Sequence, residues 1–253
     1  MQESVSQIII LNVKFDNLTK GELLHYFTEG LLLTPNIDVV LNNNCNKDVY
    51  EAYKRARFTI CDSRVLGLFA PLVGCRFKEV IPGSTFFEDY YMYHATDLNC
   101  TIFLLGAAEG VGEVAKKNIN KKVGRNIVVG TYSPPMGFDK DENESRRIIS
   151  IVNESKASVV VTGLSEPRQP IWLAKYMDSF LYAKSFLALG STIDMEAGMV
   201  NKAPLFYRKH SLEWLYRMFS QPKRTIPRVF RDLKFFWYFF LQIIGKYKNP
   251  FVD

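Results

Sequence analysis

The sequence predicts an α/β protein with a mostly parallel sheet and helices on both faces. Short β-branched runs alternate with helical stretches through most of the chain, a pattern typical of parallel sheets covered on both sides. Polar or glycine-rich clusters follow several of the predicted strands. The alternation stops near Gly198, where a basic and aromatic segment begins. We therefore expect a Rossmann-like body followed by a C-terminal helical appendage.

The elements follow in order along the chain. Seven apolar runs are predicted strands: Gln7–Phe15, Ile37–Leu41, Phe58–Cys61, Thr101–Leu105, Ile127–Thr131, Ser158–Thr162 and Ser185–Leu189. A first helix is predicted after Thr19, where Glu22 completes a capping box. Further helices are predicted over Asp48–Arg57, Ser84–His94, Gly110–Lys122, Glu142–Ser155 and Pro170–Tyr182.

Charge divides the chain into two expected domains, residues 1–201 and 202–253. The 253 residues carry a net charge of +6. Residues 202–253 hold eleven Lys and Arg against three acids, and 14 of the 35 aromatic residues, so the whole basic excess lies there. We expect a body ending at residue 201 to fold without this appendage and to be more soluble.

The appendage suggests a membrane surface more than nucleic acid. Its basic residues are interleaved with Phe, Trp and Tyr, as in segments that lie in a bilayer interface. Its most apolar run, Phe235–Ile244, is half as long as the roughly 20 residues that a span needs and is flanked by Lys234 and Lys246. Nucleic-acid binding would leave Glu213, Trp214 and the strand-end glycine clusters unexplained, so we expect no nucleic-acid partner.

Cysteine and histidine usage excludes some classes of site. Cys45, Cys61, Cys75 and Cys100 form no Cys-x-x-Cys pair and have no nearby His at ligand spacing, so no structural zinc is expected. The scattered histidines and the lack of a nucleophile elbow disfavour a serine hydrolase. No basic residue precedes the first apolar run, so we do not expect this run to be a signal peptide. Together these features point to the cytoplasm.

Candidate site residues cluster where the predicted strands end, because ligands bind outside the carboxyl ends of strands in such a sheet. These clusters are Asn42–Asn44, Asp62–Ser63, Gly106–Gly112, Gly163–Gln169 and Gly190–Asp194. The glycines of Gly106–Gly112 would let backbone N–H groups approach a phosphate, although a tight turn without a ligand explains them equally well. Asp62 is a candidate general base or an N-cap.

Two charged patterns have alternative explanations. Asp139 and Asp141 form an Asp-x-Asp pair that could hold a divalent metal, but helix-start acids before Glu142–Ser155 are the simpler explanation. In the appendage, four arginines recur at spacings of 7, 4 and 3, near one helical face: Arg217, Arg224, Arg228 and Arg231. They suit bidentate phosphate recognition, while a solvated face is the alternative.

Taken together, these motifs resemble the bacterial WecG/TagA/CpsF glycosyltransferase family over nearly the whole chain. The most specific block is LALGSTIDMEAGMVNKAPLFYRKHSLEWLYRMFSQPKR. Its matching positions are Gly190, Asp194, Ala197, Gly198, Ala203, Pro204, Leu212, Glu213, Trp214, Arg217, Pro222 and Arg224. Upstream, ARFTICDS resembles the motif that carries the catalytic Asp, here Asp62. VTGLSEPRQPIW resembles the Gly-Pro-Lys-Gln-Glu segment, with Gln169 at the Gln.

The resemblance is incomplete around the expected sugar pocket. The positions that depart from the family pattern are Ser63, Val80, Thr85, Arg168 and Pro170. The Asn-rich stretch ending at Asn44 corresponds loosely to the family's Thr-x-Asn element. These departures leave open another UDP-hexose donor such as UDP-glucose, or a non-catalytic member that scaffolds a polysaccharide-synthesis complex.

The resemblance implies an inverting, metal-independent glycosyltransferase without a cofactor. Family members transfer N-acetylmannosamine or its uronic acid from a UDP-sugar to a polyprenyl-diphosphate-linked glycan. They serve teichoic acid, common antigen or capsule synthesis on the inner face of the bacterial membrane. Such a protein would be cytoplasmic and peripheral, with an anionic membrane surface as partner. Association between copies of the chain is left open.

The resemblance also assigns roles to residues. Asp62 would be the base and Asn44 would hydrogen-bond sugar or acceptor, while three arginines stabilise the leaving diphosphate: Arg217, Arg224 and Arg228. Asp194 would either orient the site or cap a helix. The other expected substrate-binding residues are Gly106, Glu109, Gly110, Gly163, Gln169, Gly190 and Glu213.

Overall fold

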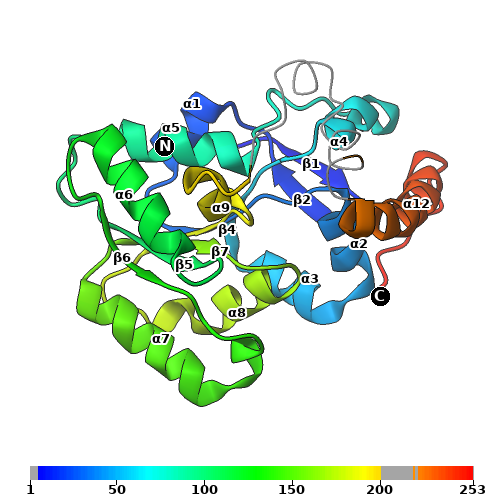
Figure 1. The fold of residues 1–253 in the computed structure, drawn as a ribbon. Coiled ribbons are helices and arrows are strands. Elements are labelled where there is room, and N and C mark those ends of the chain that lie inside the picture. The colour runs from blue at the N-terminus through cyan, green and yellow to red at the C-terminus, as the bar shows by residue number, and fades with distance from the viewer. Residues whose placement is uncertain (1–4, 201–218, 220–221, 253) are drawn as a thin grey trace.

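The computed structural model describes residues 5–200, 219 and 222–252. Its centre is a sheet of six strands in the order β4-β3-β8-β7-β5-β6, and all neighbouring strands run parallel (Figure 1). These strands are β3 (Gly30–Leu33), β4 (Ala56–Thr59), β5 (Ile102–Gly106), β6 (Val128–Tyr132), β7 (Val159–Gly163) and β8 (Ser185–Ala188). The predicted Rossmann-like α/β architecture is confirmed.

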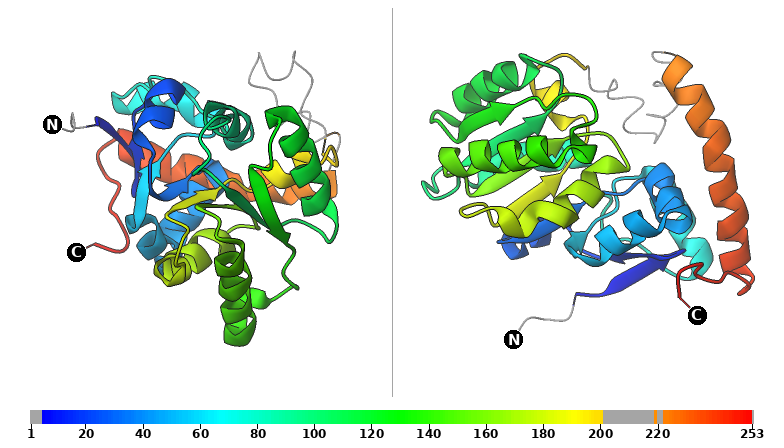
Figure 2. Two further views of the ribbon diagram at one scale, coloured as in Figure 1. Left: turned by 90° about the vertical axis from the view of Figure 1, so that its left-hand side faces the viewer. Right: turned by 90° about the horizontal axis from the view of Figure 1, so that it is seen from below.

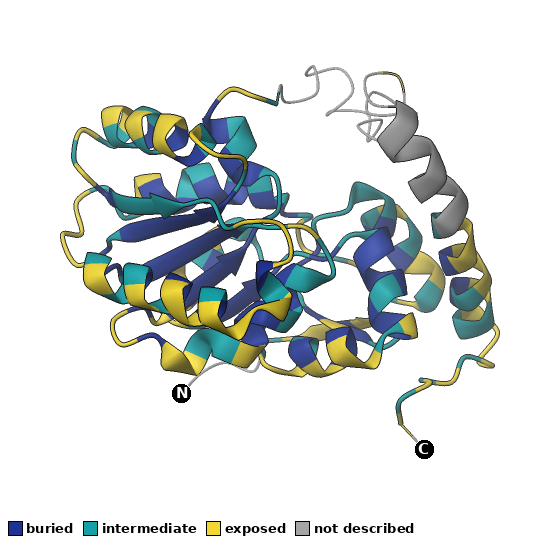
Figure 3. Cartoon of the chain, turned by 60° about the horizontal axis from the view of Figure 1, so that its bottom comes forward, coloured by how far each residue is buried: buried dark blue, intermediate teal, exposed yellow. Residues whose placement is uncertain are grey.

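Helices cover both faces of the sheet, and alternate strand residues point to each face. Leu32, Leu104 and Leu187 pack in one buried cluster, whereas their neighbours Leu31 and Phe103 pack in the other. This alternation follows from the two-residue period of a strand. The buried strands between helices with exposed outer faces are visible in Figure 3.

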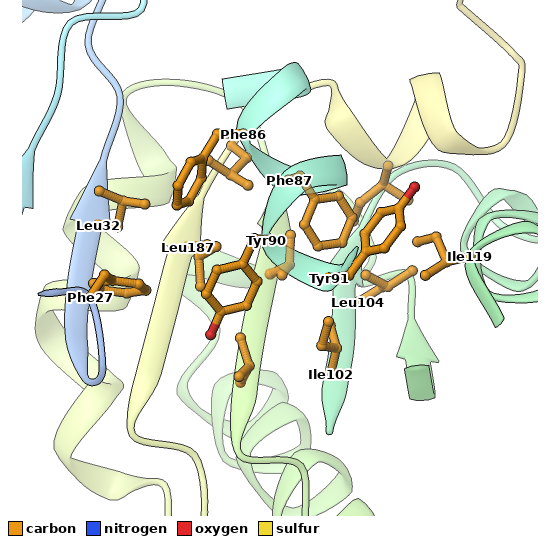
Figure 4. Packing of buried hydrophobic residues seen from close by; sticks show 14 of the residues in the cluster. Phe27, Leu32, Phe86, Phe87, Tyr90, Tyr91, Ile102, Leu104, Ile119 and Leu187 are labelled. Carbon is orange, nitrogen blue, oxygen red and sulfur yellow. The ribbon is translucent and has the colours of Figure 1, made fainter. Parts of the chain in front are cut away.

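The first face is covered by α1 (Lys20–Tyr26), α5 (Gly83–Tyr93), α6 (Val111–Val123) and the short α9 (Thr192–Glu196). Aromatic side chains dominate this cluster. Figure 4 shows Phe86, Phe87, Tyr90 and Tyr91 of α5 over the strands. Because α5 is anchored by these four rings, its N-terminus is held in a fixed position over the sheet.

The second face is covered by α3 (Lys47–Lys54), α7 (Glu142–Ser155) and α8 (Arg168–Tyr176). Trp172 of α8 is fully buried, and its indole N–H donates to Ser145 Oγ of α7 at 3.0 Å. The short 3-10 helices η2 (Phe138–Lys140) and η3 (Met177–Ser179) flank these helices. The second cluster therefore joins α7 and α8 beneath the loop that follows β7.

A third cluster lies beside the sheet and includes the C-terminal helix. It brings together the hairpin of β1 (Gln7–Ile10) and β2 (Val13–Asp16) with α2 (Ile37–Cys45), α4 (Arg64–Phe69), η1 (Ala70–Val73) and α12 (Pro222–Ile243). Phe235 and Phe239 of α12 are buried in this cluster, and Figure 2 shows α12 lying along one side of the body. A body ending at residue 201 would therefore expose this cluster to water.

The structure corrects two strand predictions. Gln7–Phe15 is a hairpin, because the chain reverses at Leu11, whose φ is 52°. Ile37–Leu41 is the start of helix α2, and the strand of this segment is β3, which ends at Leu33, four residues before Ile37. The β-branched residues of this segment suggested a strand, but the Asn36 side chain caps the helix by accepting from the Val39 N–H at 3.4 Å.

The remaining element predictions are confirmed, with ends that differ by a few residues. The Thr19–Glu22 capping box is present, with both reciprocal hydrogen bonds formed. Within the described residues, no helix is both long and apolar enough to cross a bilayer.

Candidate active site at the carboxyl ends of the strands

Asp62 follows β4 at the carboxyl edge of the sheet. Its Oδ1 accepts a hydrogen bond from the Gly83 backbone N–H at 3.1 Å, and its own N–H donates to the Pro35 carbonyl at 3.4 Å. Gly83 is the first residue of α5, so the carboxylate takes up one of the N–H groups left free at a helix N-terminus. The positive end of the α5 helix dipole therefore lies at this carboxylate.

The ends of β3 and β8 meet beside Gly83. Thr34 directly follows β3, and its Oγ1 donates to the Ala188 carbonyl of β8 at 3.2 Å. A Cβ added to Gly83 would lie 3.2 Å from Leu189 Cδ2 and 3.3 Å from Thr34 Oγ1. The lack of a side chain at Gly83 therefore allows α5 to begin against both strand ends, with Asp62 on its other side.

The same edge continues from β8 to β7 and β5. A Cβ on Gly163 would lie 3.2 Å from the Gly190 carbonyl oxygen, and one on Gly106 would lie 2.8 Å from the Gly163 carbonyl. The Ala107 N–H donates to the Gly163 oxygen at 3.3 Å. Gly106 also has a φ of +116°, which side chains disfavour. Three of the predicted glycine clusters therefore touch one another, and the row of contacts runs from Asp62 to Ala107.

The loop after β5 leads into a helix N-terminus that no side chain caps. Gly110, in a left-handed conformation, is the N-cap of the 13-residue helix α6 and provides no side-chain acceptor. Ser133, which follows β6, holds the loop by donating from Oγ to the Ala108 carbonyl at 3.2 Å. Glu109 is exposed in this loop. A helix start of this kind suits an anionic group such as a phosphate.

Ala107 adds local strain to this loop. Its φ is 63°, which is the left-handed conformation. For a residue with a Cβ, this conformation costs roughly 1–2 kcal/mol. Its N–H contact to Gly163 holds it there. Strained backbone of this kind is concentrated at functional sites, so its position on the row supports the assignment of this edge.

Gln169 shapes the loop after β7. Its side chain is buried, and its Oε1 accepts from the Leu164 N–H at 3.0 Å. The neighbouring Arg168 donates to Ser165 Oγ at 2.6 Å and forms an ion pair with Asp139 at 3.7 Å. The contact observed for Gln169 is therefore with the loop itself, and this contact fixes the backbone beside Gly163.

Asp194 lies in the first turn of α9, where negative charge complements the helix dipole, while Ser191 is the N-cap position. The other end of α9 is held by the buried Glu196, which accepts from Lys122 Nζ at 3.0 Å and from the Tyr91 hydroxyl at 3.1 Å. Burial raises the pKa of the Tyr91 hydroxyl, which therefore remains a donor. Both expected roles of Asp194 remain predictions.

The strand-end position predicted for Asn44 is wrong. Asn44 lies near the end of helix α2, where its buried side chain accepts from the Tyr247 hydroxyl at 2.5 Å. The segment Thr34-Pro35-Asn36, directly after β3, is itself a Thr-x-Asn sequence and lies beside Asp62 through the Pro35 carbonyl. The signal for it was Pro35, which ends the apolar run and precedes the Asn36 cap.

The appendage residues are described only in part. Glu213 and Arg217 lie outside the described residues. Arg224 and Arg228 lie on the backbone of α12, in its first two turns, and their side chains are outside the described part. Their expected roles at the diphosphate remain predictions.

The Asp-x-Asp pair is explained by helix capping. Asp141 is the N-cap of α7, and its Oδ1 accepts from the Asn143 and Glu144 N–H groups at 2.9 and 3.2 Å. In the part of the chain that the structure describes, no group of three or more His, Cys, Asp or Glu side chains is placed to hold a metal ion.

Fold and site together define a Rossmann-like α/β protein with a carboxylate and an open helix N-terminus on one edge of its sheet. Residues 8–249 match the sequence profile of the glycosyl transferase WecG/TagA/CpsF family. The chain belongs to this family and is a glycosyltransferase, as the resemblance implied.

A curated relative covers most of the chain. It is 23% identical over 232 residues, which are 88% of each protein. This relative is the N-acetylglucosaminyldiphosphoundecaprenol N-acetyl-beta-D-mannosaminyltransferase of Staphylococcus aureus strain MRSA252. Its name describes transfer of an N-acetylmannosaminyl group to a lipid-diphosphate N-acetylglucosamine.

Proposed function

We propose that the chain transfers N-acetylmannosamine, or its uronic acid, from a UDP-sugar to N-acetylglucosamine on a polyprenyl diphosphate. The product would serve a bacterial cell-surface polymer such as wall teichoic acid or capsule. The observation that carries the proposal is the row of contacts from Asp62 to Ala107, since it joins a strand-end carboxylate to an open helix N-terminus on one edge. The family match and the relative's activity support it.

Asp62 is the proposed general base. In an inverting transfer, the acceptor hydroxyl oxygen bonds to the anomeric carbon as the bond from that carbon to the diphosphate breaks. The hydroxyl proton passes to Asp62, and UDP leaves with the bonding electrons. The hydrogen bond from the Gly83 N–H holds one oxygen of this carboxylate in a fixed position at the edge of the sheet. The beta linkage in the relative's name supports inversion from an alpha-linked UDP-sugar.

Charge on the departing UDP needs stabilisation. The N-terminus of α6, with Gly106, Gly110 and Glu109 in its loop, is the proposed binding region for the donor. There, backbone N–H groups would meet the diphosphate, and the Glu109 carboxylate would accept hydrogen bonds from donor hydroxyls. Arg217, Arg224 and Arg228 are proposed to supply the positive charge, so that no metal is required.

The loops after β7 and β8 complete the proposed pocket. Gly163 and Gly190 touch the row directly, and Gln169 fixes the loop between β7 and α8. Asp194 and Glu213 are proposed to orient the sugar or the acceptor. Three of the residues that depart from the family pattern lie around Asp62 and this loop. Ser63 caps α4, Thr85 lies in the first turn of α5, and Pro170 is buried in α8. They are the proposed determinants of donor choice.

Residues 1–201 are proposed to form the catalytic domain, and residues 202–253 are proposed to form a C-terminal appendage that associates with the membrane. The acceptor is lipid-linked in the relative, so the enzyme has to reach a membrane surface. Basic and aromatic residues on α12 suit the anionic inner face of the bacterial membrane. The enzyme would therefore be cytoplasmic and peripheral.

A donor screen tests the proposal. The full-length protein would be incubated with a short-chain polyprenyl-diphosphate N-acetylglucosamine and one UDP-sugar at a time, and both UDP and glycolipid product would be measured. UDP-N-acetylmannosamine or its uronic acid should give product with release of UDP. Product only with UDP-glucose would correct the donor, and no product with any UDP-sugar would favour a non-catalytic scaffold.

A further inference from the structure

The body presents an exposed apolar tip directly after the candidate base. The tip consists of α4 and η1, residues 64–73. Within it, Leu66 and Ala70 are buried, while Leu68 and Leu72 are 66% and 57% exposed. Leu68 lies in the last turn of α4, and Leu72 lies in η1, which follows directly. This exposed pair is not explained by the packing of the core.

Helix α12 carries an apolar stripe next to this tip. Its exposed apolar residues recur at helical spacings of 3, 4 and 7, which places them on one side: Leu233, Phe236, Trp237, Phe240 and Ile243. The exposed Ile244 follows directly after the helix. Phe235 and Phe239 on another side of α12 are buried in the third cluster. The stripe is therefore a second apolar face, separate from the one that docks α12 on the body.

Phe69 joins the tip to the stripe. Its ring contacts the Phe236 ring, with centroids 5.3 Å apart, and the Phe239 ring, with centroids 6.1 Å apart. Since Phe236 belongs to the stripe and Phe239 to the docked side, Phe69 lies at the boundary between them. Figure 1 shows α4 beside α12. Leu68 and Leu72 belong to the same tip as Phe69, which is the residue that contacts the stripe. We call the combined surface of Leu68, Leu72, Leu233, Phe236, Trp237 and Phe240 the apolar face.

Four exposed basic residues lie in or shortly after the segments that form the apolar face. Lys234 borders the stripe on α12, Lys246 and Lys248 follow the helix, and Arg76 follows η1. None of these four has an ion-pair partner within the described part of the chain. An aromatic and aliphatic surface bordered by unpaired cations is complementary to an anionic lipid bilayer, in which rings lie at headgroup level and cations meet phosphates.

We propose that Leu68 and Leu72 of the α4–η1 tip enter the bilayer together with the α12 stripe, so that the body itself contacts lipid. This inference rests on the proposed transfer to a lipid-linked acceptor. Ser63 caps α4 by accepting from the Leu66 N–H at 3.3 Å, and Asp62 immediately precedes it. The six residues of α4 extend about 9 Å. Insertion of the tip would therefore hold Asp62 close above the headgroups, within reach of an acceptor diphosphate.

The test compares two double variants of the full-length protein. Leu68→Ser with Leu72→Ser removes the tip's contribution to the apolar face. The matched control, Leu98→Ser with Leu181→Ser, replaces leucines that are 78% and 75% exposed and that precede β5 and β8, at the opposite edge of the sheet. Exposed substitutions of this kind change stability little, and circular dichroism would check that both variants fold.

Binding is measured by sedimentation with vesicles of phosphatidylcholine containing phosphatidylglycerol. The tip variant should bind at least about fivefold more weakly than the control variant, because two leucines no longer leave water. Equal binding by the two variants would overturn the proposal. Loss of self-association in the tip variant, with unchanged vesicle binding, would also overturn it and identify a second copy of the chain as the occupant.

A second measurement separates this inference from the proposed reaction. An environment-sensitive dye on Leu72→Cys should shift to the blue on addition of vesicles, and the same dye on Leu98→Cys should not. A dye on Leu72→Cys that does not respond would contradict insertion. Neither binding measurement needs turnover, so both remain informative if the transfer assay fails. If transfer is observed, the tip variant should retain activity on a soluble short-chain acceptor.

Discussion

The Asp62 carboxylate accepts a hydrogen bond from the Gly83 backbone N–H at 3.1 Å. This contact joins the loop after β4 to the start of α5, two segments that are 21 residues apart. It gives Asp62 a structural role in addition to the proposed catalytic one. The two roles are separable, because a neutral side chain of the same shape can accept the hydrogen bond but is a far weaker base.

The stability of Asp62 variants tests the structural role. Asp62→Ala removes the acceptor and should destabilise the protein by about 1 kcal/mol, the usual effect of losing a helix-start acceptor. Asp62→Asn keeps an oxygen at the same place, so its free energy of unfolding should fall clearly less than that of Asp62→Ala. Urea denaturation of the three proteins measures the difference. Equal losses of stability in the two variants would mean that the hydrogen bond to Gly83 contributes nothing in addition to the negative charge of Asp62.

The close approach of β5 and β7 predicts the effect of a side chain at Gly106. Gly106→Ala places a Cβ 2.8 Å from the Gly163 carbonyl, at a φ of +116°. Gly124→Ala is the matched control, because Gly124 also has a positive φ but no atom within 4 Å of the added Cβ. Overpacking should make Gly106→Ala about 1–3 kcal/mol more destabilising than the control. Thermal or urea unfolding measures the stability of both variants. Similar losses of stability would count against close packing between Gly106 and Gly163.

The contact between Asn44 and Tyr247 should contribute to docking of the C-terminal segment. Tyr247→Phe leaves the buried Asn44 oxygen without this donor and should cost about 1–2 kcal/mol. The double variant with Tyr247→Phe and Asn44→Leu should lose less stability than the sum of the two single variants, by about 1 kcal/mol. A double-mutant cycle by urea denaturation measures this coupling. Additive losses would show that the two side chains act independently.

Acid should weaken the capping box at Thr19. The Lys78 ammonium and then the Thr19 N–H hold the pKa of Glu22 at about 2, below its ordinary 4.5. Between these values the unfolded chain binds a proton that the folded chain does not, so stability falls as the pH drops from about 4.5 to about 2. Glu22→Gln should reduce this slope in unfolding experiments at stepped pH. A parallel pH profile for the variant would refute the assignment.

Much of the fold follows from local patterns in the sequence. The continuous apolar runs of β5 and β7 predicted buried parallel strands, because both of their faces are covered. The segment from Gly30 to Leu41 was misassigned, since both of its halves are apolar. Only the Asn36 cap and the position of Pro35 distinguish strand from helix there.

The sequence predicted the site residues that directly follow strands. It did not predict the contacts that depend on how helices pack on the sheet. Parallel strands bring their carboxyl ends to one edge, so Asp62, Gly106, Gly163 and Gly190 were placed together from their positions alone. The Gly83 contact depends on how the aromatic residues of α5 pack against the sheet. Asn44 was assigned to the edge because its helix was taken for a strand, and it instead docks Tyr247.

The central claim is that Asp62 removes the acceptor proton at this edge of the sheet. The most direct measurement is the single-turnover rate of sugar transfer by Asp62→Asn, with saturating UDP-sugar and a polyprenyl-diphosphate N-acetylglucosamine acceptor. If Asp62 is the base, the rate should fall at least about tenfold below that of the unaltered protein, equivalent to about 1.4 kcal/mol of barrier, with the folded structure retained. A fall of less than about tenfold would mean that Asp62 is not the base.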